Sequence, residues 1–244
     1  MPDRPERADA LGGLVRDALA SRQASTGRRE LAVLDVGGGT GLLAVPLARS
    51  GHRVTVVDPT LDALAMLERR AAEAGLAAGS IAAIQGDAAD LAHLVEPGSV
   101  DLVLCHNVIE VVDDPAAALA GVAATLERGG VLSLLAANRH AVVLAKALAG
   151  RVDEARHALA DPFGRWGDAD PVPRRFTMDQ LQLLVAQSGL VADAVHGVRV
   201  FADLVPGRID AAQLAELGAL EASAANHPAF RELAVHLHVR AHRV

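Results

Sequence analysis

The chain has 244 residues, of which 51% are hydrophobic, 22% charged and 2% aromatic, and its formal net charge is −7. This length suits one domain with a sizeable core. No apolar run approaches the ~20 residues that cross a membrane, and the first thirty residues lack the apolar stretch of a secretory signal. Cys105 is the one cysteine, which excludes an internal disulfide, so we expect a cytoplasmic protein without a membrane partner.

The acidic excess argues against a general polyanion binder, and it is unevenly distributed. Residues 31–137 contain five Lys or Arg against thirteen Asp or Glu, whereas residues 138–176 contain seven basic and five acidic residues. The chain has no tyrosine, so aromatic platforms for single-stranded nucleic acid are scarce. The acidity therefore lies in the predicted core, and the later segment is mildly basic.

Strand-like apolar runs alternate with helical segments over residues 31–137, which predicts an α/β fold with a doubly wound, mostly parallel sheet. The predicted strands are Leu31–Val36, Arg53–Asp58, Ile81–Gln85, Val100–Cys105 and Val131–Ala136, and the predicted helices are Gly41–Arg49, Leu61–Ala74 and Pro115–Leu126. Asp114 and Pro115 suit the N-cap and first position of the last helix, which we expect to stop at Gly129-Gly130.

Residues 138–176 interrupt this alternation, with a helix-like piece at Ala141–Leu148 and then a loop rich in Gly and Pro. We predict that they form a lid or substrate cap inserted into a single domain over residues 1–244. The elements expected after it are a helix over Thr177–Gln187 with Thr177 as N-cap, a strand at Leu190–Phe201, a helix near Asp210–Ala222 and a strand at Leu233–Val239. The order predicts a Rossmann-like, seven-stranded sheet whose last strand is antiparallel.

A glycine-rich turn joins the first predicted strand to the first helix. Its residues are Asp35, Gly37, Gly38, Gly39 and Gly41. Glycines permit a tight turn and close approach of a ligand to the backbone, and the helix N-terminus supplies N–H donors. In a dinucleotide enzyme these donors hold a pyrophosphate. Here Leu42 replaces the last glycine of that motif, and a carboxylate beside the turn suits an ammonium group and repels a phosphate.

Two further carboxylates extend the pattern. Asp58 ends the second strand, 21 residues after Gly37, where a carboxylate can accept both hydroxyls of a ribose. Asp87 follows the third strand and can accept from an adenine amino group, with the backbone N–H of Ala88 beside it. A cofactor with an amino-acid end, a ribose and an adenine matches this set. The alternative is that the glycines only shape a loop and the aspartates only cap helices.

These segments, together with residues 106–112, resemble the motifs of class I S-adenosylmethionine-dependent methyltransferases. The resemblance implies S-adenosyl-L-methionine as cofactor, held by the glycine turn, by the aspartates and by Pro59, Ala88, His106 and Asn107. It places His106 near the reacting end, so His106 is a candidate catalytic residue. The alternative is that His106 is a strand-end residue with a satisfied hydrogen bond.

A narrower resemblance concerns residues 131–134, 197–203 and 236–239, with Asn138. They are similar to the bacterial tRNA 5-carboxymethoxyuridine methyltransferases, which esterify the carboxylate on a wobble uridine. A carboxylate needs in-line placement rather than a strong base, and an arginine can grip it through two hydrogen bonds. The expected acceptor-binding residues are Arg199 first, then Arg174 or Arg175, with Asn138 and Trp166. The alternatives are a surface salt bridge between Arg199 and Asp203, and a Trp166 that anchors the lid.

Two departures leave other functions open. The aromatic, basic N-terminal arm of that family is not recognisable in Met1–Gln23, and residues 161–170 carry one Arg among three acids. With so few cations for the phosphates, the affinity for tRNA would be weak unless a dimer pools the positive charge of two chains. A small-molecule O-methyltransferase and a catalytically silent, cofactor-binding regulator are the alternatives, and the chain is expected to be a monomer or homodimer. His236 and His238 have metal-like spacing without further ligands nearby, so we expect no metal.

Overall fold

The computed structural model describes residues 10–77, 79–205 and 209–244. Its chain forms two compact units. The first unit comprises Arg16–Leu135, Gln182–Ala194 and Val239–Val244, and the second comprises Ala136–Leu181, Val195–His238 and the chain before Arg16. Part of the N-terminal arm, residues 1–9, lies outside the described residues. The single domain with a cap over residues 138–176 stays a prediction.

The strands form one seven-stranded sheet in the order β3-β2-β1-β4-β5-β7-β6. The sheet is mostly parallel, with antiparallel strands at its end, which confirms the predicted Rossmann-like α/β fold. The strands are β1 (Ala32–Val36), β2 (Arg53–Asp58), β3 (Ile81–Gln85), β4 (Val100–His106), β5 (Leu126–Ala137), β6 (Leu190–Val198) and β7 (His236–Arg243).

The helices alternate with these strands in the first half of the chain and dominate the second unit. They are α1 (Ala10–Thr26), α2 (Ala44–Arg49), α3 (Leu61–Glu73), α4 (Leu91–Leu94), α5 (Pro115–Thr125), α6 (Arg139–Leu148), α7 (Val152–Ala160), α8 (Met178–Gln187), α9 (Ala211–Ala225) and α10 (Pro228–Arg231), with a 3₁₀ turn η1 at Ala88–Asp90. Among the described residues, we find no helix with the length and apolar character needed to cross a membrane.

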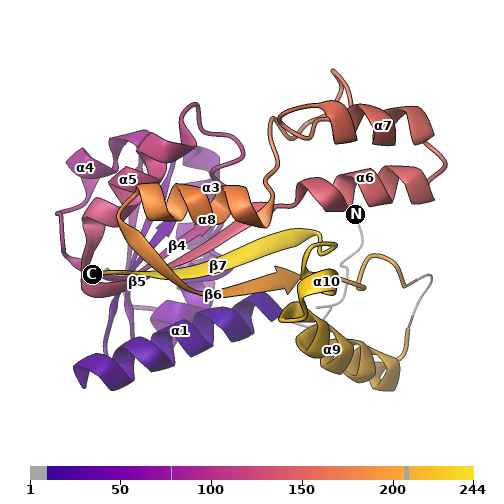
Figure 1. Cartoon of the computed structure of the whole chain (residues 1–244). Helices are drawn as coiled ribbons and strands as arrows, with labels where there is room; N and C mark the ends of the chain where they lie inside the picture. Colours follow the sequence, from indigo (N-terminus) through magenta and orange to yellow (C-terminus); the bar gives the residue numbers. More distant parts are fainter. Residues whose placement is uncertain (1–9, 78, 206–208) are drawn as a thin grey trace. The chain divides into compact units, whose positions relative to one another are not determined.

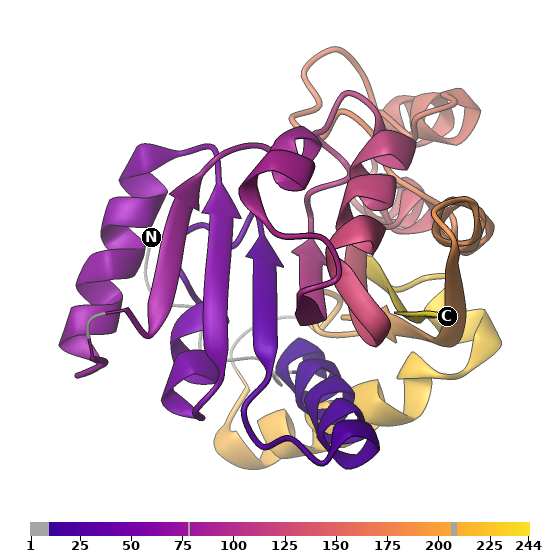
Figure 2. The ribbon, with the colours of Figure 1, turned by 90° about the vertical axis from the view of Figure 1, so that its left-hand side faces the viewer.

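Parallel pairing in the first unit brings the loops after β1, β2 and β4 to one edge of the sheet. Asp35 on β1 pairs with Val56 on β2 and with Leu104 on β4, and Figure 2 shows β3, β2 and β1 as arrows pointing the same way. Val56 and Leu104 are fully buried, as expected for strands covered on both faces. The carboxyl ends of these strands therefore share the edge at which open α/β sheets bind ligands.

The junction between α5 and β5 differs from the prediction. Asp114 caps α5 as expected, since its Oδ1 accepts the N–H groups of Ala116 and Ala117 at 2.9 and 3.1 Å. The helix ends at Thr125, and β5 already begins at Leu126, which pairs with Val100. Residues 127–130 then bulge out of register, with Gly129 at φ +72°. The predicted strand start was wrong because this bulge hides the first strand residue from the apolar pattern.

In the second unit, the segment 138–176 contains a helical hairpin of two helices where one was expected, and the predicted loop follows it over residues 161–176. Helices α6 and α7 pack against each other (Figure 1), and Lys146 Nζ of α6 lies 2.6 Å from Glu154 Oε2 of α7. The two ends of this segment are fastened together, because Arg139 N donates to Phe176 O at 3.0 Å and Phe176 N donates to Ala137 O at 2.9 Å. The sequence missed α7, which is only nine residues long.

The ends of α8, β6 and β7 can also be compared with the predicted elements. Thr177 caps α8 as predicted, since its Oγ1 accepts the N–H of Gln180 at 3.3 Å. Strand β6 ends at Val198 rather than Phe201, because Arg199 takes a left-handed φ of +63° that no strand residue adopts. Strand β7 starts at His236 rather than Leu233, because the chain before it still belongs to the turn of α10, with Ala234 N donating to Arg231 O.

Candidate functional site

The glycine turn after β1 has a backbone that residues other than glycine rarely adopt. Gly37, Gly39 and Gly41 have φ values of +67°, +52° and +75°, in the region that favours glycine. A Cβ on Gly37 would lie 2.6 Å from Val108 Cγ2, and a Cβ on Gly38 would lie 2.5 Å from the Asp35 carboxyl group. The glycines are thus required both by conformation and by space.

Asp58 at the end of β2 holds this turn in place. Its Oδ2 accepts the N–H of Gly39 and its Oδ1 accepts the N–H of Thr60, both at 2.9 Å. Each carboxylate oxygen has two lone pairs, so one on each remains for a further donor. Asp58 can therefore shape the turn and still accept from the hydroxyls of a ribose.

Asp35 is the second carboxylate at this edge, and only 3% of it is exposed. Burial, and secondly the charge of Asp58, raise the pKa of Asp35 from 3.8 to about 7. A cationic ligand group beside these two acids would stabilise their ionised forms. The arrangement suits an ammonium group, as the sequence predicts.

Asp87 and its neighbours form the third part of the predicted cofactor site. Asp87 is exposed and caps η1, accepting the N–H of Ala89 at 3.1 Å, so the capping alternative describes its present contact. Ala88 is buried, and the carbonyl of Pro59 accepts from Gln85 Nε2 at 3.3 Å. The Asp87 carboxylate still has lone pairs that can accept from an adenine amino group. Its adenine-binding role stays a prediction.

The loop after β4 carries the remaining predicted residues. His106 Nε2 lies 2.9 Å from the hydroxyl of Ser133 on β5, which is the satisfied strand-end hydrogen bond of the alternative interpretation. Asn107 is exposed, takes φ +57° and donates its N–H to Leu135 O at 2.9 Å. The strained conformation of Asn107 turns the chain sharply at the ligand-binding edge.

The second unit contains a cavity of about 620 Å³. Apolar side chains of α6 form much of its wall, and a few polar groups converge on it, as is usual for a small-molecule site. It is lined by Ala137, Asn138, Ala141, Val142, Leu144, Ala145, Leu148, Ala149, Val172, Arg175, Val200, Asp203, Leu204, Leu233, Val235 and His236.

Arg175 is the arginine that lines this cavity, and Asp170 holds it. Its Nη1 and Nη2 donate to the two carboxylate oxygens at 2.7 and 3.0 Å. Burial alone would raise the pKa of Asp170, but the hydrogen bonds from Arg175 and from the N–H groups of Trp166 and Val172 outweigh it and lower that pKa. This buried fork fixes the guanidinium. Arg174 is half-buried and is not among the lining residues.

Arg199 forms the salt bridge that the sequence analysis considered as its alternative. Its Nη2 lies 2.5 and 2.6 Å from the two carboxylate oxygens of Asp203, and Asp203 lines the cavity. His236 lines it too, and burial together with the charge of Arg199 lowers the pKa of His236 to about 4. The cavity therefore presents an uncharged imidazole beside an ion pair.

Asn138 and Trp166 have mainly structural contacts. The Asn138 side chain donates to the carbonyls of Glu232 and Ala234 at 2.8 and 2.7 Å and accepts the N–H of His140. The Trp166 ring lies under Lys146, whose Nζ is 3.5 Å from the ring centroid. This contact matches the anchoring alternative for Trp166.

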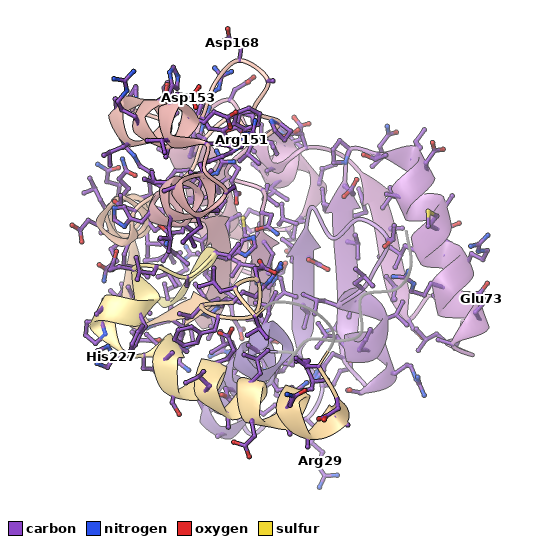
Figure 3. All side chains as sticks on the ribbon, turned by 90° about the vertical axis from the view of Figure 1, so that its right-hand side faces the viewer. Arg29, Glu73, Arg151, Asp153, Asp168 and His227 are labelled. Atoms are coloured by element: carbon purple, nitrogen blue, oxygen red, sulfur yellow. The ribbon has the colours of Figure 1, made fainter. Side chains whose placement is uncertain are left out.

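The outer end of the α6–α7 hairpin is charged and exposed. Arg151, Asp153 and Asp168, which Figure 3 labels, are exposed, and Arg151 forms an ion pair with Glu154. Within residues 10–77, 79–205 and 209–244, no group of three or more His, Cys, Asp or Glu could hold a metal ion. His238 instead pairs with His196, their Nδ1 atoms lying 3.1 Å apart.

Two residues that the sequence did not single out, Asp170 and Glu221, also lie around the cavity, and His236 was considered only as a metal ligand. Asp170 holds Arg175. Glu221 of α9 is buried, although acids are rarely buried. The one available signal for it is an acid in register with Leu217 and Ala224, on the apolar face of its helix.

Known proteins with related sequences are methyltransferases. The family described as methyltransferase domain matches residues 34–134. A tRNA 5-carboxymethoxyuridine methyltransferase of Escherichia coli (strain K12) is 36% identical over 183 residues, 74% of this chain and 67% of the relative. A ubiquinone biosynthesis O-methyltransferase of Xanthomonas campestris pv. campestris (strain B100) is 33% identical over 150 residues, 61% of this chain and 59% of the relative.

Solved structures of lower sequence identity share the fold. An S-adenosylmethionine-dependent methyltransferase from Methanosarcina mazei matches with a TM-score of 0.60 and 19% identity, over 89% of this chain and 94% of that chain. The magnesium protoporphyrin IX methyltransferase from Synechocystis PCC 6803 with bound SAH matches with a TM-score of 0.61 and 17% identity, over 96% and 84%. The chain therefore belongs to the class I S-adenosylmethionine-dependent methyltransferases, with S-adenosyl-L-methionine as its cofactor.

Proposed function

We propose that this enzyme transfers the methyl group to a carboxylate oxygen of an acceptor that binds in the cavity of the second unit, with residues 138–176 as the acceptor cap. The observation that carries the proposal is an apolar cavity with a fixed guanidinium in its wall, that of Arg175. A second guanidinium, that of Arg199, is paired with the lining residue Asp203. Guanidinium groups bind carboxylates through two parallel hydrogen bonds.

The charge state of the cavity is consistent with a carboxylate acceptor. When bound, S-adenosyl-L-methionine supplies a sulfonium methyl group, which a carboxylate oxygen takes without losing a proton, leaving a neutral thioether. No strong base is needed, and His236, with its pKa lowered to about 4, is neutral at physiological pH. Its imidazole can offer one hydrogen bond to orient an acceptor without attracting its charge. Placement then supplies the catalysis.

Two acceptor classes remain candidates. The relative from Escherichia coli supports 5-carboxymethoxyuridine in tRNA. A small carboxylic acid is supported by the mostly apolar lining of the cavity, which suits a small molecule. Both classes yield a methyl ester.

Mass spectrometry tests the reaction. Purified enzyme is incubated with methyl-labelled cofactor and either tRNA from cells lacking the gene or a panel of small carboxylic acids. We expect a labelled product that mild alkali cleaves to methanol, as esters require. A labelled product that resists alkali would contradict the carboxylate, and cofactor binding without any turnover would favour the silent regulator.

Arg199→Ala tests the acceptor grip. We expect the KM for the acceptor to rise by roughly tenfold or more, about 1.4 kcal/mol, while the affinity for S-adenosylhomocysteine is unchanged. The matched control is Arg156→Ala, which removes an exposed arginine of α7. Equal kinetics of the two variants would reject this role of Arg199.

A further inference from the structure

We propose that Glu221 of α9 is a positioning residue for acceptor binding. Its carboxylate fixes the turn over residues 200–202, which carries Arg199 at one end and Asp203 at the other. The proposal rests on the proposed function insofar as the cavity bordered by this turn is the acceptor site. Glu221 itself does not line the cavity, so it would act through the turn.

The contacts of Glu221 are three consecutive backbone N–H groups. Its Oε2 accepts from Val200 at 2.8 Å, and its Oε1 accepts from Phe201 at 2.8 Å and from Ala202 at 2.7 Å. These N–H groups follow the end of β6 and have left the strand. Since Val200 and Ala202 are each only 4% exposed, the carboxylate provides the acceptor that water cannot.

The turn needs this support because Arg199, the residue just before it, has a strained backbone. Arg199 has φ +63°, a conformation that a side chain with a Cβ tolerates only when the surroundings fix it. On one side the carbonyl of Arg199 accepts the N–H of Val235 at 3.0 Å. On the other side Glu221 holds the next three residues. Together they aim the guanidinium at Asp203.

The chemistry of the site requires a carboxylate. Glu221 is 4% exposed and lies on the same face of α9 as Leu217 and Ala224, both buried, where an acid is costly unless it is fully hydrogen-bonded. A carboxylate only accepts, so both of its oxygens match the N–H donors. A glutamine of the same size would turn an amide NH₂ toward at least one of them.

The test compares Glu221→Gln with Glu216→Gln, which changes an exposed glutamate on the same helix. Hydrogen exchange measures the amides of residues 200–202. We expect at least about tenfold faster exchange there in Glu221→Gln and no change in Glu216→Gln. Unchanged exchange in Glu221→Gln would overturn the proposal.

Kinetics separate positioning from a merely structural role. In Glu221→Gln we expect the KM for the esterified acceptor to rise about tenfold, with kcat and the affinity for S-adenosylhomocysteine nearly unchanged. Glu221→Asp keeps the charge and should recover part of the loss, and it replaces Glu221→Gln if that variant does not fold. A fall in thermal stability with an unchanged KM would overturn the proposal. If wild-type enzyme esterifies neither tRNA nor small acids, the proposed function fails, and the exchange experiment still decides the support of the turn.

Discussion

Two turns of this molecule solve the same physical problem with different residues. The turn after β1 and the turn after β6 both use left-handed backbone conformations, at Gly37, Gly39 and Gly41 in one and at Arg199 in the other. In both, a carboxylate from elsewhere in the chain accepts from the backbone of the turn. Asp58 accepts the N–H of Gly39 in the first turn, and that of Thr60 in its own loop, whereas Glu221 accepts three N–H groups of residues 200–202.

The difference between the two turns lies in what each leaves for a ligand. The first turn exposes backbone, and its glycines keep side chains away from the cofactor. The second turn presents a side chain, that of Arg199, at the cost of a strained backbone. On the sites proposed above, backbone and carboxylates would bind the cofactor, whereas side chains that can change would bind the acceptor.

The largest expected effect comes from breaking the first turn. In Gly38→Ala the new methyl group would overlap the carboxyl group of Asp35 at 2.5 Å, so we expect S-adenosylhomocysteine to bind at least about thirtyfold more weakly, about 2 kcal/mol by titration calorimetry. The control is Gly121→Ala in α5, whose Cβ would meet no atom closer than 3.7 Å. Equal affinities for the two variants would remove the steric argument.

A second prediction concerns the charge of the first turn. Because Asp35 has a pKa of about 7 in the folded chain against an ordinary 3.8, it is ionised in the unfolded chain and takes up a proton on folding between these pH values. The free energy of unfolding should therefore fall as pH rises from 4 to 7, and level off above it. Asp35→Asn should abolish this decline, which chemical denaturation at several pH values measures.

The affinity for the cofactor should also depend on the ionisation of Asp35. An ammonium group favours ionised Asp35, so the affinity of wild-type enzyme for S-adenosylhomocysteine should rise about tenfold between pH 6 and pH 8, with release of a proton. Titrations in two buffers of different ionisation enthalpy detect that proton. A pH-independent affinity, equal in wild type and Asp35→Asn, would show that Asp35 does not meet the cofactor.

The smallest expected effect sharpens the contrast in the second turn. Arg199→Gly relieves the left-handed backbone conformation of a residue with a Cβ, which costs about 1 kcal/mol. It also removes the ion pair with exposed Asp203, which contributes less to stability. We expect a variant at least as stable as wild type, by thermal unfolding, whose KM for the acceptor is raised. A clear loss of stability would mean that the Arg199 side chain stabilises the turn, and would contradict the view that the turn positions the side chain.

The same contrast explains what the sequence could predict. The strands around the cofactor edge follow continuous apolar runs, and β2 and β3 begin and end at the predicted residues. The glycine turn is readable because steric exclusion leaves glycine as the one residue type that fits. Helix α7 and the start of β5 were not predicted, the first because it is only nine residues long and its buried residues are alanines, and the second because a bulge interrupts the strand.

The acceptor side was predictable only in part. Arg175 and Arg199 were foreseen as candidates, and Asp203 was foreseen as the salt-bridge partner of Arg199. Asp170, the partner of Arg175, was not foreseen, because nearby acids also occur in any exposed loop. Glu221 contacts residues about 20 positions away, and no local pattern marks a hydrogen bond of that range. Side chains that act through tertiary contacts leave only their burial as a signal, and burial needs the fold.

The fastening of residues 138–176 has a consequence for how such enzymes diversify. Hydrogen bonds between Arg139 and Phe176 and between Phe176 and Ala137 bring the two ends of the segment together, so its closure does not depend on what lies between. An insertion or exchange between such fixed ends costs little loop entropy. The α6–α7 hairpin could therefore be exchanged in evolution without change to the glycine turn. A related enzyme could gain a new acceptor in this way.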